Sequence, residues 1–522
     1  MKEGFTNPFA HLKSCYGGET VLRKHYKDAV EGSAQESSAT SSIGGYFKAS
    51  NATEVHKSLH GWIDLVVSKM LPISYVEDIQ FRNFSKFSHN FSNERVKQVI
   101  LELVKIVEKK LELEMKAAGC GAIMHDGWTL SGVHYVGLFA SYNRKIKVFK
   151  NGKGSIEIET TISLIACAPM AAISESDDSD DEEPTNDAAN FNAKVHAQYF
   201  IKMFQYYNLN VKQWAKCSTA DNTTTNVKTA RELGIPHVGC NSHKLNLDMN
   251  DWMEAPALKN MIESVADTMK EAKNSLKNAS LLRRLTSLKP VLYNKTRWSG
   301  KFNRLSRFVR VRVQLVTVAE DENSNLTVRA DIVFYRKTVR VTLVLDKFNK
   351  VTIFMQTRLI TLSMCRRSLD HLIARATAGR TKEGSVFYRN GFNPKRTQPR
   401  GTLTPYPDFE SGVVKIQRGE SGAMNDAEKL ACVPLLKGQQ VAADDEAAEA
   451  EVEEEEEETD FLDVVRAEEA AALKGNSSQY INCDFILGSV AEVERLWSTA
   501  KHILTEERRG MMHPIISKLS CF

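Results

Sequence analysis

The chain has 522 residues, of which 42% are hydrophobic and 26% charged, with a formal net charge of +4. This composition is typical of a globular protein of several domains. We expect no membrane span or membrane partner, because no apolar run is long enough. The nine scattered cysteines indicate free thiols in a reducing compartment.

The small net charge hides a segregation of acidic and basic residues. The runs 175–183 and 444–460 contain 7 and 12 acidic residues and no basic ones, which leaves 69 basic against 46 acidic residues elsewhere. Residues 301–400 contain 21 basic and 7 acidic residues. A basic body favours a polyanionic partner, most simply nucleic acid, although basic surfaces are often only solvated.

Residues 1–55 contain little that could form a core. His11 and Cys15 have the spacing of the second half of a zinc finger, but two ligands cannot close a tetrahedral site, so we expect no zinc. Helices are predicted at 62–70 and 94–115. The second has an apolar stripe at helical spacing.

The apolar period changes after residue 119. We predict strands at 119–126, 133–142, 160–169, 214–220 and 236–239, with helices at 189–207, 226–233 and 243–253. The first two strands form a hairpin. This pattern predicts an α/β fold with a mixed sheet in the order 3-2-1-4-5.

Two aspartates follow the apolar parts of neighbouring strands in that order. Asp126 ends the first strand and Asp221 ends the fourth, so both carboxylates should emerge at one edge of the sheet. An aspartate at a strand end is usually a turn residue or a helix cap. Together, however, the two could bind Mg²⁺, in the arrangement of RNase H-like nucleases.

A metal cage of this kind needs a third carboxylate. Glu494 is the candidate, on a helix predicted over Val490–Leu504 with Ser489 as its cap, and Glu492 is its competitor. Residues 256–395 are predicted to be mainly helical, although the Val- and Thr-rich stretch 311–342 leaves strands open. Residues 396–478 are predicted to be disordered.

Four stretches, in this order, resemble the hAT superfamily of DNA transposases. They are MHDGWTLSGVHYVGLFASY, STADNTTTNVKTARELGIPHVGCNSHKLNL, NKTRWSGKFNRLSRF and SVAEVERLWSTAKHILTEERRGMMHP. The resemblance covers most of the chain. It implies an RNase H-like core interrupted by a mainly helical insertion and completed by a helical C-terminal dimerisation segment.

The resemblance also implies roles for individual residues. The metal-binding catalytic acids would be Asp126, Asp221 and Glu494, and the DNA contacts would be Cys240, His243, Arg297 and Trp298. Trp298 would stack on an extruded base. Residue patterns alone favour Cys240 and His243 as core residues at a turn, and leave Trp298 equally open as a core residue of the insertion.

Six segments follow from these patterns together with the resemblance. They are a truncated BED-type finger remnant and linker (1–55), a helical DNA-binding or dimerisation segment (56–116), the first part of the core (117–255), the insertion (256–395), the disordered acidic linker (396–478) and the dimerisation region (479–522). The half-finger and the charged linker fit a truncated or decaying copy.

The expected function is that of a nuclear cut-and-paste transposase dependent on Mg²⁺ or Mn²⁺. It would cleave double-stranded DNA, form hairpins and transfer strands to a target, acting as a homodimer or higher oligomer. The alternative is a catalytically inactive, domesticated or relict protein that binds DNA and dimerises. A cellular RNase H-like nuclease is a weaker third interpretation, because the C-terminal block disfavours it.

Overall fold

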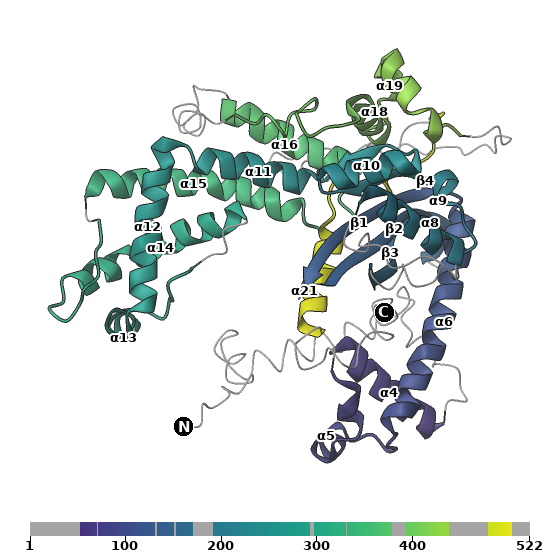
Figure 1. Ribbon diagram of the computed structural model, residues 1–522, viewed down its shortest axis with the longest axis horizontal. Coiled ribbons are helices and arrows are strands. Elements are labelled where there is room, and N and C mark those ends of the chain that lie inside the picture. Colours follow the sequence, from purple (N-terminus) through teal and green to yellow (C-terminus); the bar gives the residue numbers. More distant parts are fainter. Residues whose placement is uncertain are drawn as a thin grey trace, which may run out of the picture. The chain divides into compact units, whose positions relative to one another are not determined.

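The computed structural model describes residues 53–69, 71–130, 133–150, 153–170, 192–292, 297–329, 331–377, 393–437 and 479–503 (Figure 1). Contacts divide the chain into two units. One contains the described parts of Met1–Glu102 together with Lys145–Glu157, and the other contains Leu103–Arg144 and the described residues from Ile158 onward. Across these ranges, the helices are all too short or too polar to cross a membrane.

Several predictions concern parts of the chain outside the described residues. These parts include the half-finger residues His11 and Cys15, both acidic runs, and the dimerisation region beyond residue 503. The predictions for them stay predictions.

The described part of the first unit before residue 103 is mainly helical. It contains α4 (Glu54–Ser68), η1 (Ile73–Val76), α5 (Ile79–Ser85) and the start of α6 (Asn93–Ala118). Helix α4 begins earlier than the predicted residue 62 because the Thr53 side chain accepts a hydrogen bond from the His56 N–H and caps it. The predicted long helix at 94–115 is confirmed as α6.

Five strands form a mixed sheet in the order β3-β2-β1-β4-β5, as the sequence predicts. They are β1 (Gly121–Leu130), β2 (Val133–Lys150), β3 (Lys153–Pro169), β4 (Ala215–Ala220) and β5 (His237–Gly239). β1 pairs with β2 in an antiparallel hairpin, and β4 runs parallel to both β1 and β5.

Several strand boundaries differ from the prediction: β2 continues to Lys150 and β3 begins at Lys153. The difference that concerns the predicted site is in β1. Asp126 does not end β1, because β2 pairs with β1 as far as Leu130 opposite Val133. The partner that stops early is β4, which ends at Ala220. Asp126 therefore lies inside an antiparallel ladder but beyond the parallel one.

Helices cover one face of the sheet around a common apolar cluster. They are the end of α6, α8 (Ala193–Tyr206), α9 (Val211–Trp214) and α10 (Thr224–Leu233). Ile123 and Tyr142 of the sheet are buried there. The Trp214 Nε1–H donates to the Met115 carbonyl at 2.9 Å, which joins α9 to the end of α6.

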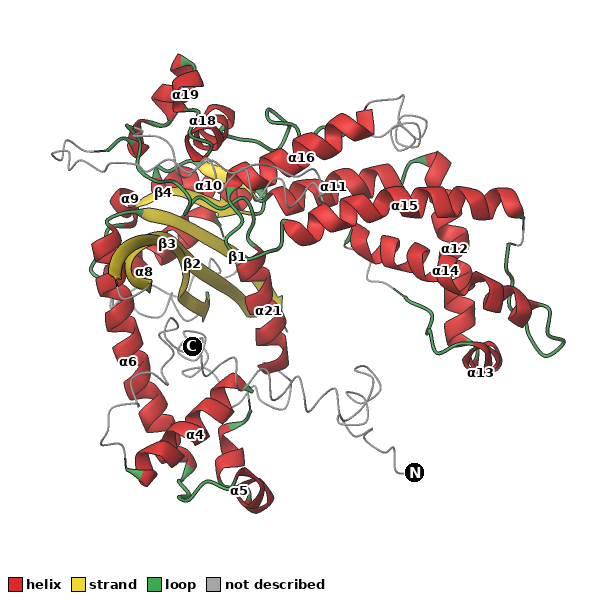
Figure 2. Ribbon diagram, turned by 180° about the vertical axis from the view of Figure 1, so that it is seen from behind, coloured by secondary structure: helices red, strands yellow, loops and turns green. Residues whose placement is uncertain are grey.

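The opposite face is covered by later parts of the chain. Alternation places Ala122 and Met124 on this face, where they are buried among residues that follow the insertion. These residues belong to α18 (Pro407–Gln417), α19 (Asp426–Ala431), η4 (Val433–Leu435), the segment 480–487 and α21 (Ala491–Ile503). The views of Figures 1 and 2 both show α21 beside β1, which it contacts.

The predicted disorder from residue 396 onward is wrong for the part that the structure describes. Residues 407–435 form short helices whose apolar side chains, such as Phe409 and Val413, are buried against the sheet. The Gln417 side chain donates to the carbonyls of Cys483 and Ile486 at 2.8 and 3.0 Å. Pro and Gly residues between such short helices hide their periodicity in the sequence.

The regular elements described between β5 and α18 are all helices, joined by loops and turns. It contains α11 (Asn241–Met253), α12 (Pro256–Asn274), α13 (Leu276–Leu285), α14 (Trp298–Ala319), α15 (Ile332–Phe354) and α16 (Leu362–Thr377), which share one apolar core. Within the Val- and Thr-rich stretch 311–342, the residues up to Ala319 and from Ile332 onward are helix, and the described residues between them form a turn and loop rather than a strand. Thr338, Thr342 and Thr352 each donate the hydroxyl hydrogen to the carbonyl four residues earlier, a local hydrogen bond compatible with a helix.

Candidate active site

Asp126 and Asp221 occupy equivalent positions on neighbouring strands. In the parallel pairing of β1 with β4, Met124 lies opposite Thr219. Each aspartate follows its residue of that pair by two positions, so both belong to the same face of the sheet. The prediction that two aspartates come from neighbouring strands is thus met, although Asp221 lies in the loop after β4.

The carboxylate of Asp126 is partly buried and is held by two donors. Its Oδ1 accepts the Gly127 N–H at 2.9 Å, and its Oδ2 accepts the Trp497 Nε1–H at 3.1 Å. Burial first, then the charges of Asp221 and Glu494, raise the pKa of Asp126 to about 7, although both hydrogen bonds act in the opposite direction. The carboxylates of Asp221 and Glu494 therefore lie within electrostatic range of Asp126, and we call the three together the carboxylate triad.

Asp221 is paired with His243, one of the predicted DNA contacts. The Nδ1 atom of His243, in the first turn of α11, lies 3.2 Å from Oδ2 of Asp221. Burial raises the pKa of Asp221, whereas the positive charges of His243 and Arg297 oppose that rise. His243 is thus brought to the site, and both partners keep part of their surface exposed.

Glu494 comes from the first turn of α21 and pairs with Arg297. The Nη2 atom of Arg297 lies 3.0 Å from Oε2 of Glu494, and the Arg297 side chain is 59% exposed. The competing acid Glu492 forms ion pairs with Arg495 and Arg358 instead. Glu494, unlike Glu492, also contributes to raising the pKa of Asp126, so we take Glu494 as the third member of the triad.

Two of the predicted DNA-contact residues lie in the core. Cys240 is fully buried, and burial raises the pKa of its thiol to about 12, so it is a neutral packing residue beside Ser489. Trp298 is 1% exposed and packs against Phe302 in the insertion core, which leaves no ring face open to a base. Of the two open interpretations of Trp298, the structure favours the core residue.

Three contributors to the site were not predicted from the sequence. The Trp497 Nε1–H donates to Asp126, and the Trp497 ring stacks on Trp128 at 5.5 Å. The Asn246 side chain accepts the Trp298 N–H at 3.1 Å and so caps α14, which starts beside Arg297. A sequence signal existed only for the third, Gly137.

Gly137 lies directly opposite Asp126 in the hairpin. A Cβ atom there would stand 2.9 Å from Leu496 and 3.1 Å from Trp497, so α21 can pack on β2 only where no side chain is present. An isolated glycine inside a predicted strand often marks such a close approach.

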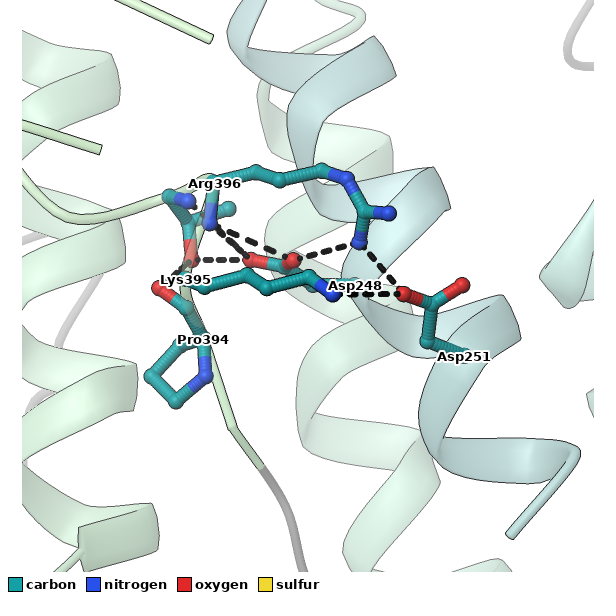
Figure 3. Close-up of polar contacts among 6 residues, drawn as sticks. Asp248, Asp251, Pro394, Lys395 and Arg396 are labelled. Atoms are coloured by element: carbon teal, nitrogen blue, oxygen red, sulfur yellow. Dashed lines mark hydrogen bonds and ion pairs between the residues drawn. The ribbon is translucent and has the colours of Figure 1, made fainter. Parts of the chain in front are cut away.

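The far end of α11 is fixed by a second acidic group, drawn in Figure 3. Asp248 has a completely buried side chain and accepts hydrogen bonds from the main-chain N–H and the Nη1 of Arg396. It also accepts the Thr397 N–H at 3.0 Å and the Thr397 hydroxyl at 2.9 Å. Oδ2 of Asp251 accepts a hydrogen bond from the same guanidinium at 2.6 Å. This clamp attaches the segment that leaves the insertion to the helix that carries His243.

The triad supplies the kind of ligand that a hard divalent cation prefers. Carboxylate oxygens suit Mg²⁺ or Mn²⁺, and a cation among the three acids would offset the repulsion that raises the pKa of Asp126. In the described conformation each carboxylate is instead engaged by a donor of the protein. Accordingly, the described residues include no group of three or more His, Cys, Asp or Glu arranged to hold a metal ion.

Compared with known proteins, the chain matches no family model and no curated protein.

Proposed function

We propose that this protein is a metal-dependent DNA nuclease and strand transferase with an RNase H-like core, acting as a cut-and-paste transposase of the hAT type. The observation that carries the proposal is the approach of three acids from β1, the end of β4 and α21, close enough to raise the pKa of Asp126 to about 7. A site of mutually repelling, partly buried acids is a frequent property of catalytic centres.

In this proposal Asp126, Asp221 and Glu494 would hold divalent cations. Such cations supply charge stabilisation for the attacking and leaving oxygens of a phosphodiester. Gly127 and Trp497 orient the Asp126 carboxylate through their hydrogen bonds. The exposed guanidinium of Arg297 is free to turn from Glu494 to a phosphate, which it can bind bidentately.

The partners would be double-stranded DNA and a second copy of the chain, in the nucleus. Glu494 is separated from Asp221 by the whole insertion, so the site is complete only when α21 packs on the sheet. Trp497 and Gly137 make that packing depend on the residues beside Asp126.

A second candidate is a catalytically inactive protein that binds DNA and dimerises. It is favoured by two ion pairs of the described conformation. His243 pairs with Asp221 and Arg297 pairs with Glu494, so two of the three acids already have a partner in the protein. The two candidates differ in one measurable property, which is Mg²⁺-dependent cleavage.

The test is cleavage of supercoiled plasmid DNA by the purified full chain in Mg²⁺ and in Mn²⁺. We expect Asp126→Asn, Asp221→Asn and Glu494→Gln each to lower the rate by at least about 100-fold, because each removes several kcal/mol of transition-state stabilisation. Glu492→Gln is the matched control on the same helix turn and should cleave normally. DNA binding should persist in all four variants.

Two outcomes would change the assignment. Full cleavage by Glu494→Gln would remove Glu494 from the catalytic set. Binding of DNA by the wild-type chain without cleavage in either metal would favour the second candidate.

A further inference from the structure

Helix α15 carries a row of basic side chains on its outward face. We call Arg336, Arg340, Lys347 and Lys350 the basic stripe. The opposite face of the same helix is buried in the insertion core through residues such as Phe334, Val341, Leu345 and Phe348. Burial of the inner face fixes α15 in the fold, and the basic stripe is therefore held in place on its outer face.

The spacing of the stripe places its members in line. Steps of four, seven and three residues return to one side of an α-helix, and the row is about 21 Å long at 1.5 Å per residue. The residues three and four positions from Arg336 and Arg340 include no acid. Asp346 is the single acid of the helix and lies 3.8 Å from Lys350.

The next helix continues the positive surface. Burial lowers the pKa of His371 on α16, and the positive charges of Arg375 and of Lys347 lower it further. Lys347 of α15 and Arg375 of α16 therefore both lie close enough to His371 to act on it, although their like charges repel one another. Such an arrangement is stabilised when a polyanion lies across it.

We propose that the basic stripe binds the phosphate backbone of duplex DNA, outside the candidate active site and without regard to base sequence. Duplex DNA carries one negative charge per about 1.7 Å of its axis, so a straight row of cations can neutralise several phosphates together. The stripe contains no aromatic side chain, although the exposed Ile332, Val333 and Leu343 lie three or four residues from its arginines. It therefore lacks the aromatic anchors typical of a protein-binding surface.

This inference rests on the proposed function for the identity of the partner, but its test measures binding alone. The full-length wild-type chain and Arg336→Glu/Arg340→Glu would be titrated against a 30-base-pair duplex of arbitrary sequence, in buffer without divalent metal. Fluorescence anisotropy at several salt concentrations gives Kd and its salt dependence. The matched control is Lys105→Glu/Lys212→Glu, which makes the same change of charge on the exposed surface of α6 and α9.

We expect the stripe variant to bind about 10- to 100-fold more weakly. The slope of log K against log salt should fall by about 2, since each phosphate contact contributes about 0.9. The control should keep the wild-type slope. Circular dichroism and thermal melting would show whether each variant folds like the wild type.

An unchanged slope in a folded stripe variant would overturn the proposal and leave this face to a protein partner. Equal losses in the stripe variant and the control would also overturn it, because only the net charge would then matter. A stripe that governs binding in a chain that never cleaves DNA would support this inference while contradicting the proposed function.

Discussion

Helix α11 connects two groups of acids that differ in how completely their charges are compensated. Near its start, the triad contains mutually repelling carboxylates, and burial with repulsion raises the pKa of Asp126 to about 7. Further along α11, Asp248 receives two main-chain N–H groups, a hydroxyl and a guanidinium. Both groups are acidic, but only the second has its hydrogen-bonding capacity filled from within the chain.

This difference suggests a structural role for Asp248 and a functional role for the triad. A buried carboxylate that is fully hydrogen-bonded holds elements together, and removing it leaves its donors unpaired. A group of acids that repel one another costs stability, and a protein that keeps them uses them for binding or chemistry. Substitutions at the two groups should therefore change stability in opposite directions.

The largest expected loss of stability is at the clamp. Asp248→Ala should lower the free energy of unfolding by about 3–5 kcal/mol, because it leaves the Arg396 guanidinium and two N–H groups without their buried acceptor. Urea denaturation followed by circular dichroism measures the change.

The neighbouring acid provides the control for the clamp. Asp251 contacts the same guanidinium but its side chain is 52% exposed, so Asp251→Ala should cost less than about 1 kcal/mol. Equal losses from the two substitutions would show that the burial of Asp248 is not what makes the clamp strong.

A smaller loss of stability is expected where α21 packs on the sheet. Gly137→Val should cost about 1–3 kcal/mol through overpacking, since its side chain would meet Leu496 and Trp497. Cleavage should be lost with it, because Glu494 moves with α21. The measurement combines denaturation with the plasmid assay.

Gly422 serves as the comparison for Gly137. A Cβ atom at Gly422 meets nothing within 4 Å, so Gly422→Val should keep both stability and cleavage. Retention of cleavage by Gly137→Val would contradict the dependence of the site on this contact.

The smallest effect is a pH dependence at the triad, measured in metal-free buffer. The pKa of Asp126 rises from 3.8 to about 7 on folding, so between these values the native state binds more protons than the unfolded state. The stability that Asp126 contributes is therefore full below pH 4 and is lost as pH rises towards 7. As pH rises over this range, the free energy of unfolding of Asp126→Asn should increase relative to that of the wild type by on the order of 1 kcal/mol. The difference is no larger because part of the charge is screened by solvent.

An exposed aspartate of α12 tests this interpretation of the pH profile. Asp267→Asn removes one carboxylate from the surface and should follow the wild-type profile. If Asp126→Asn also follows it, repulsion within the triad is not significant.

The order of the sheet could be predicted because each strand has its own apolar pattern. The two aspartates could be predicted because strand pairing fixes which residues emerge side by side, as with Met124 and Thr219. The end of β1 could not be located, since Gly127–Leu130 are held by pairing with β2 rather than by their own apolarity.

The contacts across long sequence separations were invisible in the sequence. Nothing in a sequence indicates that the Trp497 indole will meet Asp126, or that Asn246 will cap a helix 52 residues later. The burial of Trp298 was equally undetermined, because a tryptophan at a helix start suits either a core or a stacking surface. The short helices of 407–435 were missed because each is too brief to display a period.

The late cover on the sheet has a consequence for biosynthesis. The hydroxyl of Ser141 bonds to the carbonyl of Phe485, 344 residues later, within the cover of the apolar face that contains Ala122 and Cys217. At about 5–20 residues per second, a ribosome needs roughly 20–70 s to add that length. The apolar face of the sheet therefore stays uncovered by these residues throughout that interval. Nascent chains of this protein should consequently aggregate more readily than finished ones and depend on chaperones while they are made.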